Sequence, residues 1–337
     1  MCKTMYSSHL HLFFIQAPSF SDLSKYRFAV MKSLFLLLLC LTSSVICTHK
    51  SKKIHLERKE SKPLPVVIWH GMGDSCCNPL SMGAIKKHLE EKIPGVYVHS
   101  LRLGNNFATD TKQSFFANMN ELVAIVCLHI MKDPELQNGY NAIGFSQGAL
   151  FLRALAQRCA KPKMNNLISI GGPQNGIFGL PYCLGDNFFC NSVRWLLEQG
   201  AYEGPVQRRV VQAQYWHDPN VEETYLHKSI FLADINNEKT VNHKYKENLI
   251  QLKNFVLVKF DGDHMVVPKE SEWFGYYAPN DQSTILAFNE TRLYKEDLIG
   301  LKTLHDSSRL HFLTWPGEHL RVNLDTLDED IIQKFLT

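Results

Sequence analysis

Gly144-Phe145-Ser146-Gln147-Gly148 is the most informative segment of this 337-residue chain for its architecture, because it places a G-x-S-x-G pattern between a predicted strand and a predicted helix. The apolar residues 140–143 before it predict a short β-strand, and residues 149–156 after it have helical spacing without a breaker. A strand, a tight turn and a helix form the surroundings of a nucleophile elbow, which exposes a serine hydroxyl at the top of a sheet. Ser146 is therefore a candidate nucleophile. The alternative is a glycine-rich connection whose serine only caps the helix.

Outward from this motif, apolar runs alternate with helical patterns along most of the chain. Strands are predicted at 64–69, 96–100, 140–143, 167–170, 255–260 and 310–314, and helices at 81–92, 113–132, 149–156 and 320–336, with a hairpin between the last two strands. Such alternation is typical of the α/β class, with a mostly parallel sheet flanked by helices. The expected core comprises 64–170 and 251–337. Residues 171–250 break the pattern and predict an insertion that shapes the substrate site at the strand ends.

The first 47 residues have the features of a secretory signal peptide. Met31-Lys32-Ser33 provides a basic start, an apolar run follows at 34–41, and small residues lead to Cys47. The apolar run is too short to span a membrane. We therefore expect residues 1–47, an upstream extension plus the signal peptide, to be removed, which leaves 48–63 as a solvated N-terminal segment. The alternative is a signal anchor that stays uncut.

Cysteine number and charge also limit the possible functions. Of the nine cysteines, three lie within residues 1–47, and the even number that remains fits an oxidising compartment. No C-x-x-C pair or histidine cluster indicates a metal site. The chain has 36 basic and 33 acidic residues, of which four basic residues and one acidic residue lie in 1–47. The remaining chain therefore has 32 of each and no net charge, so no nucleic-acid partner is expected. Asn289-Glu290-Thr291 is a candidate N-glycosylation site.

A reactive serine needs a base within hydrogen-bond reach and a carboxylate that orients the base. In the α/β-hydrolase order the acid and then the histidine follow the serine along the chain. The loop after strand 255–260 offers Asp261 and Asp263, although either could be only a turn residue. His319 lies between the last strand and the last helix, where the base is expected, with a helix-capping role as the alternative. The histidines less suited by position are His264, His305 and His311.

Acyl transfer also needs two N–H donors for the oxyanion of the tetrahedral intermediate. The N–H that follows the nucleophile belongs to Gln147. The second donor is expected in the loop after the first strand, His70-Gly71-Met72-Gly73, where Met72 is favoured. The alternative for this loop is a tight turn without a catalytic role.

Several of these segments resemble the lysosomal palmitoyl-protein thioesterase family, over about residues 64–335. They are Val67 to Pro79, Gly144 to Gly148, Gly171 to Gly176, Gln214 to Pro219 and Ser271 to Gly275, and the double cysteine after His-Gly-Met-Gly is the most specific element. The resemblance implies the α/β-hydrolase fold with Ser146 as nucleophile, Asp263 as acid and His319 as base. It also implies Met72 and Gln147 as oxyanion donors.

The resemblance implies three disulfides, which are Cys76–Cys77, Cys127–Cys159 and Cys183–Cys190. It also implies that residues 171–250 help to form a groove for a long acyl chain. The expected activity is hydrolysis of the thioester between palmitate and cysteine in S-acylated proteins or peptides, without a cofactor, a metal or a transmembrane segment, in the lysosome. Two rival functions remain: a secreted lipase or carboxylesterase that acts on oxyesters, and an inactive α/β-hydrolase that serves as a binding module.

Overall fold

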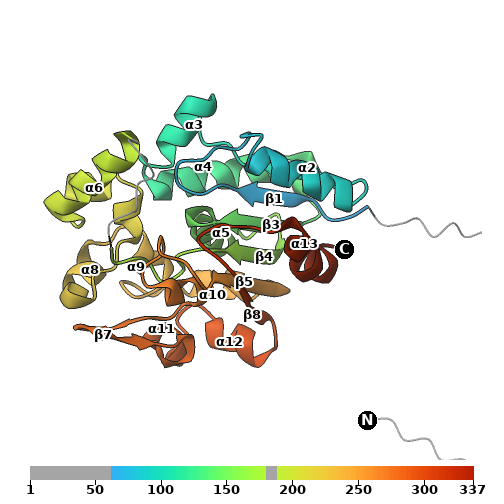
Figure 1. The fold of residues 1–337 in the computed structure, drawn as a ribbon. Helices are drawn as coiled ribbons and strands as arrows, with labels where there is room; N and C mark the ends of the chain where they lie inside the picture. The colour runs from blue at the N-terminus through green and yellow to red at the C-terminus, as the bar shows by residue number, and fades with distance from the viewer. Residues whose placement is uncertain (1–61, 180–187) are drawn as a thin grey trace, which may run out of the picture. The chain divides into compact units, whose positions relative to one another are not determined.

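The computed structural model describes residues 62–179 and 188–337, and a parallel sheet of six strands lies at the centre of this part (Figure 1). The strands are β1 (Val66–Trp69), β2 (Val98–Ser100), β3 (Tyr140–Phe145), β4 (Met164–Ile170), β5 (Asn254–Phe260) and β8 (Leu310–Trp315). Their spatial order is β2-β1-β3-β4-β5-β8, and every neighbouring pair is parallel. The predicted α/β architecture is confirmed.

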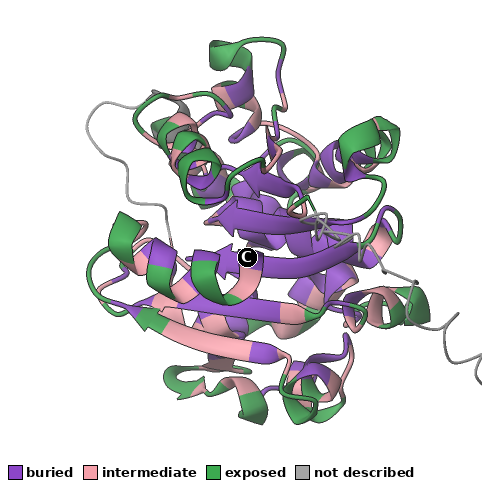
Figure 2. Ribbon diagram, turned by 90° about the vertical axis from the view of Figure 1, so that its right-hand side faces the viewer, coloured by how far each residue is buried: buried purple, intermediate pink, exposed green. Residues whose placement is uncertain are grey.

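Helices cover both faces of the sheet. They are α2 (Met82–Lys92), α3 (Phe107–Gln113), α4 (Met119–Lys132), α5 (Gln147–Arg158), α6 (Phe188–Gly200), α7 (Gly204–Gln207), α8 (Glu222–Lys228), α9 (Leu232–Ile235), α10 (His243–Leu249), α11 (Arg292–Lys295), α12 (Leu301–Asp306) and α13 (Leu324–Leu327), which continues as a π-helix over Asp328–Leu336. In β1, Val67 and Trp69 join the apolar core of α4 and α5, whereas Val66 and Ile68 join that of α2 and the C-terminal helix. The inner strands β1, β3 and β4 are thus buried on both faces, whereas the edge strands β2 and β8 are partly accessible, and the outer sides of the helices are exposed (Figure 2).

Two predicted helices have different bounds in the structure. The helix predicted over 113–132 is wrong as a single element, because α3 ends at Gln113 and α4 begins at Met119, where the Asn118 side chain accepts the Asn120 N–H. The C-terminal helix begins at Leu324 rather than at 320, because the Asn323 side chain caps it. The predicted hairpin is confirmed as the antiparallel pair β6 (Tyr276–Ala278) and β7 (Asp281–Leu286).

Residues 171–250 form helices and turns in the part of the segment that the structure describes, and this part belongs to the same compact unit as the sheet. Arg153 of α5 fastens this segment to the core. Its buried guanidinium donates hydrogen bonds to Gln174 Oε1 and O (2.8 and 2.9 Å), to Asn236 Oδ1 (2.9 Å) and to Ile235 O (3.2 Å). Burial lowers the pKa of Arg153 to about 9, although the nearby Glu238 opposes this shift.

Two of the three expected disulfides lie within the described residues, and both are present. Cys76 is joined to Cys77, and Cys127 of α4 is joined to Cys159 at the end of α5. Cys183 lies outside the described residues, as do the expected signal peptide and nearly all of 48–63, so these expectations stay predictions. No helix within 62–179 and 188–337 is both long and apolar enough to cross a membrane.

Candidate active site

Ser146 lies at the sharp turn between β3 and α5, with φ 52° and ψ −128°. A non-glycine residue rarely adopts this backbone conformation, and it costs on the order of 1–3 kcal/mol. The flanking glycines are needed because the chain doubles back tightly at Gly144 and because the end of β1 passes close to Gly148. A Cβ at Gly144 would lie 2.2 Å from Ala149 Cα, and one at Gly148 would lie 2.4 Å from Trp69 O. The G-x-S-x-G motif therefore meets the spatial requirements of this turn.

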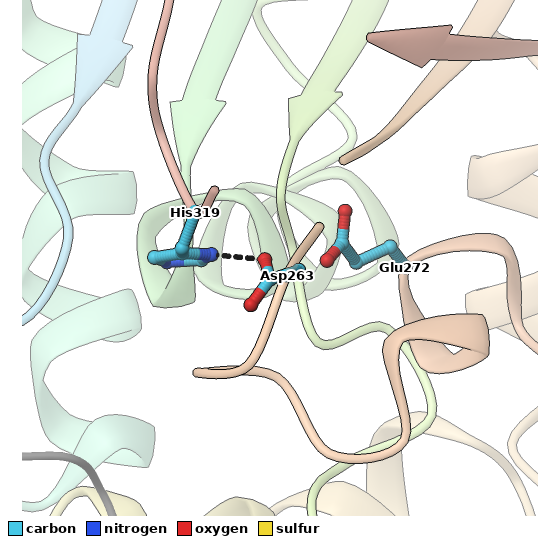
Figure 3. A group of neighbouring side chains, drawn as sticks. All are labelled: Asp263, Glu272 and His319. Carbon is cyan, nitrogen blue, oxygen red and sulfur yellow. Dashed lines mark hydrogen bonds and ion pairs between the residues drawn. The ribbon is translucent and has the colours of Figure 1, made fainter. Parts of the chain in front are cut away.

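His319 and Asp263 extend a chain of hydrogen bonds from Ser146. Asp263 follows β5 and His319 follows β8, which are neighbours in the sheet. His319 Nε2 lies 2.9 Å from Ser146 Oγ, and His319 Nδ1 is hydrogen-bonded to Asp263 Oδ2 (Figure 3). Although His319 is 173 residues from Ser146 and 56 from Asp263 along the chain, the carboxyl ends of parallel strands bring the three together.

The surroundings of Asp263 favour its ionised form. Its Oδ1 accepts hydrogen bonds from the N–H groups of Met265 (2.6 Å) and Val266 (3.0 Å). Burial opposes ionisation of Asp263, but hydrogen bonds with His319, with Glu272 and with the backbone outweigh it and lower the pKa to about 2. Asp263 is therefore an anion at acidic and neutral pH.

The other candidate acid and histidines have different positions. Asp261 is exposed and accepts the Gly317 N–H (2.9 Å), so it holds the loop that carries His319 instead of contacting the His319 ring. His264 is exposed. His305 contacts the hydroxyl of Tyr294, and His311 contacts the side chain of Asn254.

The two expected oxyanion donors belong to segments that meet at Ser146. Gln147 is the first residue of α5, where the N–H has no acceptor within the helix. The loop with Met72 approaches from β1, and a Cβ built on Gly71 would lie 3.1 Å from Ser146 Cβ. The catalytic roles of these N–H groups stay predictions, but both segments border the serine.

Sequence reasoning missed Ser114, which connects these two segments. Ser114 Oγ accepts the N–H of Gly73 (2.8 Å), and its carbonyl oxygen accepts the amide of the Gln147 side chain (2.9 Å). Gln147 Oε1 in turn accepts hydrogen bonds from Tyr215 (3.0 Å) and Gln212 (3.1 Å). No local signal marks Ser114, because it is one of several consecutive polar residues at the end of α3, and its partners Gly73 and Gln147 are distant in sequence.

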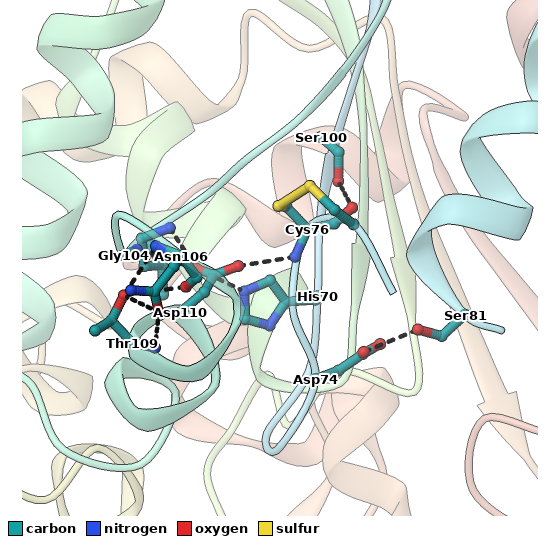
Figure 4. Close-up of a disulfide and its surroundings, with 11 residues drawn as sticks. His70, Asp74, Cys76, Ser81, Ser100, Gly104, Asn106, Thr109 and Asp110 are labelled. Atoms are coloured by element: carbon teal, nitrogen blue, oxygen red, sulfur yellow. Dashed lines mark hydrogen bonds and ion pairs between the residues drawn. A yellow bond between two sulfur atoms is a disulfide. The ribbon is translucent and has the colours of Figure 1, made fainter. Parts of the chain in front are cut away.

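A buried polar cluster around Cys76 holds the rest of the loop between β1 and α2 (Figure 4). Asp110 Oδ2 accepts the Cys76 N–H (2.8 Å), and His70 Nε2 lies 3.6 Å from Asp110 Oδ1. Ser100 Oγ donates to the carbonyl of Cys76 (2.7 Å). Burial opposes the charge on Asp110, but contacts with His70 and backbone N–H groups lower its pKa. These contacts fix both sides of the loop that presents Met72.

Glu272 is a further buried carboxyl group beside Asp263, on the 3-10 helix Lys269–Trp273. Burial first, and then proximity to Asp263, raise its pKa to about 11. Among the described residues, Asp263, Glu272 and His319 offer atoms within 4.8 Å of one another, a spacing at which a metal ion could bind. Both ring nitrogens of His319 are already hydrogen-bonded, to Ser146 and Asp263, so the arrangement favours proton transfer over metal ligation.

The sequence profile described as palmitoyl protein thioesterase matches residues 65–319. The chain belongs to the palmitoyl protein thioesterase family. Palmitoyl-protein thioesterase 1 of Caenorhabditis elegans is 62% identical over 278 residues, which cover 82% of this chain and 93% of that protein. Palmitoyl-protein thioesterase 3 of Dictyostelium discoideum is 40% identical over 259 residues, which cover 76% of this chain and 84% of that protein. In this family of hydrolases, the human lysosomal thioesterase PPT2 is 30% identical over 242 residues, which cover 71% of this chain and 76% of that protein.

Proposed function

We propose that the protein hydrolyses the thioester between a long-chain fatty acid, above all palmitate, and a cysteine of an S-acylated protein or peptide. The hydrogen-bonded series Ser146, His319 and Asp263 carries this proposal. Membership of the palmitoyl protein thioesterase family and the names of the relatives support palmitoyl thioesters as the substrate class.

The reaction proceeds in two steps through an acyl-enzyme. Ser146 Oγ attacks the acyl carbonyl while His319 Nε2 accepts the hydroxyl proton, and Asp263 holds the ring and stabilises the imidazolium. The N–H groups of Met72 and Gln147 stabilise the oxyanion. The cysteine sulfur then leaves readily, since the pKa of a free thiol is about 8.5, and it takes the proton of the His319 imidazolium, which returns the ring to its neutral form. Water, activated by His319, releases the fatty acid from Ser146.

Residues 171–250 help to bind the acyl chain in this proposal. An apolar cluster of this segment includes Leu197 and Val206, and the partly buried Met72 and Leu196 pack against it. The cluster therefore lies next to the loop that donates to the oxyanion. Leu196→Gln is expected to raise KM for a palmitoyl thioester more than for a butyryl thioester of the same peptide. An equal effect on both substrates would place the acyl chain elsewhere.

The protein also follows the secretory route to the lysosome in this proposal, with residues 1–47 removed, Cys183 joined to Cys190 and Asn289 glycosylated. The name of the human lysosomal relative and the two disulfides present support this route. Asn289 is exposed, as a glycan requires. Enzymatic deglycosylation should reduce the mass of the secreted protein but not that of an Asn289→Gln variant. An unchanged mass in the parent protein would reject glycosylation.

The decisive assay uses one acyl chain on one peptide, as a thioester of cysteine and as an oxyester of serine. The purified protein should hydrolyse the thioester with the higher kcat/KM, and Ser146→Ala should abolish this turnover while the melting temperature stays close to that of the parent. A preference for the oxyester would instead indicate a lipase or carboxylesterase. No turnover and no labelling by a serine-directed fluorophosphonate would indicate a binding module.

A further inference from the structure

We propose that Glu272 is a positioning residue for the reaction: it retains its proton and donates it in a hydrogen bond to Asp263, which keeps Asp263 ionised and oriented toward His319. This inference rests on the proposed function only in taking Ser146, His319 and Asp263 as the reacting series. It concerns a side chain that does not touch the substrate and acts through Asp263.

The hydrogen-bond inventory of the two carboxyl groups shows where a proton is required. Asp263 accepts three donors: two backbone N–H groups at Oδ1 and the His319 ring at Oδ2. Glu272 accepts one, the N–H of Phe260 at Oε2 (3.0 Å). Among the described residues, Glu272 Oε1 is buried without any hydrogen-bond donor. An ionised Glu272 would therefore bury an unsatisfied anionic oxygen, which is costly.

The two carboxyl groups are close enough to interact directly. Glu272 lies on the side of Asp263 opposite His319, with its carboxyl group toward Asp263 (Figure 3). Two carboxylates this close cannot both be ionised at low cost, so the pair holds one proton. Because Asp263 has three donors and Glu272 has one, the proton resides on Glu272. As a neutral acid, Glu272 is a donor that fits the remaining lone pair of Asp263.

The charged groups around Glu272 do not reverse this assignment. Lys259 of β5 is the nearby cation that favours ionisation of Glu272, but its Nζ lies over the ring of Trp273, 4.1 Å from the centroid. On the 3-10 helix itself, Lys269 donates to the carbonyl of Asp261. The raised pKa of Glu272 and the lowered pKa of Asp263 agree with one proton shared in this direction.

The consequence is that Asp263, the acid of the series Ser146, His319 and Asp263, stays charged when the solution becomes acidic. A hydrogen bond to an ionised carboxylate is stronger than a neutral one. Removal of the donor from Glu272 should therefore make Asp263 more basic. A more basic Asp263 stabilises the imidazolium form of His319 more strongly, which raises the pH below which His319 no longer accepts the proton of Ser146 and Ser146 loses its reactivity. A glutamine at position 272 retains both a donor for Asp263 and an acceptor for the Phe260 N–H, whereas a methionine of similar length retains neither.

The test measures the rate at which a serine-directed fluorophosphonate labels Ser146 from acidic to neutral pH. The proteins are the parent, Glu272→Gln, Glu272→Met and, as a matched control on the same 3-10 helix, Glu270→Gln. Glu272→Gln and Glu270→Gln should reproduce the pH profile of the parent. In Glu272→Met the acid limb should move up by about one pH unit, equivalent to about a tenfold loss of rate on that limb. An unchanged limb in Glu272→Met, or a similar shift in Glu272→Gln, would overturn the proposal.

A second measurement covers the case in which Glu272→Met does not fold. Infrared difference spectroscopy of the parent against Glu272→Gln at neutral pH should show the carbonyl band of one protonated carboxylic acid. Absence of this band would overturn the proposal.

Because labelling needs no thioester, a protein that labels at Ser146 but does not hydrolyse palmitoyl thioesters would reject the proposed function and leave the role of Glu272 tested. A protein that does not label would reject the nucleophile, while the infrared band still tests the proton.

Discussion

Two loops at the carboxyl edge of the sheet are built in opposite ways. The elbow after β3 is specified by small residues in one short stretch: Ser146 is strained, Gly144 allows the chain to double back, and Gly148 allows it to pass the end of β1. The loop after β5 is specified by tertiary contacts, because Asp263 depends on His319 and Glu272 from other segments. The position of the nucleophile therefore depends on five consecutive residues that fit against the end of β1, whereas the charge of the acid depends on donors from several segments of the folded core.

The largest expected effect separates the two aspartates of the β5 loop. Asp263→Asn should lower kcat/KM by about 10⁴-fold, because the amide does not stabilise the imidazolium and favours the wrong tautomer of His319. Asp261→Asn, the matched control, should lower it by less than about tenfold, since only a contact with the Gly317 N–H is altered. Steady-state kinetics on a palmitoyl-cysteine peptide distinguish the two. A greater loss in Asp261→Asn would mean that the acid is wrongly assigned.

The second prediction breaks the elbow through its space requirement. In Gly148→Ala the new methyl group would meet Trp69 O at 2.4 Å and His70 O at 2.5 Å, both backbone atoms that cannot move freely. Overpacking of this kind should cost about 1–3 kcal/mol of unfolding free energy, with a loss of activity because the Met72 loop shifts.

Gly204→Ala is the matched control for this elbow variant, since the nearest atom to its new methyl group is the flexible Arg208 guanidinium at 3.2 Å. Urea unfolding of both variants, together with their kinetics, gives the comparison. Equal stability and activity in Gly148→Ala and Gly204→Ala would show that the elbow tolerates a side chain at its second glycine.

The third prediction sharpens the description of the β5 loop through pH. The pKa of Glu272 is raised from 4.5 to about 11, so its contribution to stability is fully present below pH 4.5 and is lost as the pH rises toward the folded value. Relative to Glu272→Gln, the parent should lose about 1.4 kcal/mol of unfolding free energy per pH unit between pH 5 and 8. The lowered pKa of Asp263 acts below pH 3.8 and does not affect this range. Parallel stability curves for the two proteins would contradict a protonated Glu272.

The smallest expected effect concerns the strain at Ser146. Glycine adopts positive φ values freely, whereas alanine retains the steric cost at φ 52°. Ser146→Gly should therefore be more stable than Ser146→Ala by roughly 1 kcal/mol, after the greater flexibility of unfolded glycine is subtracted. Thermal unfolding of these two inactive variants measures the difference. A less stable glycine variant would show that the elbow is not strained.

The sequence was sufficient for features that depend on local pattern or on chain order. The elbow at Ser146 follows from its glycines, and the positions after β5 and β8 directed attention to Asp263 and His319. The split between α3 and α4 was missed because the cap at Asn118 interrupts an apolar pattern that otherwise reads as one helix.

The supporting residues were not accessible in the same way. Ser114 and Arg153 act through partners that are distant in sequence, such as Gln147 and Gln174, and no spacing rule links them. Glu272 stands in a segment that contributed to the family resemblance, but its burial against Asp263 is visible only in the fold. Folding sets such charge states, since they depend on which donors surround each buried group.

Identification of the residue that carries the acyl group during turnover tests whether Ser146 is the nucleophile. The purified protein is mixed with a palmitoyl-cysteine peptide, the reaction is quenched in acid within the first turnover, and peptide mass spectrometry locates the adduct. We predict a palmitoyl ester on Ser146 that is absent from Ser146→Ala. A palmitoyl group on another side chain, or undiminished hydrolysis by Ser146→Ala, would contradict the account.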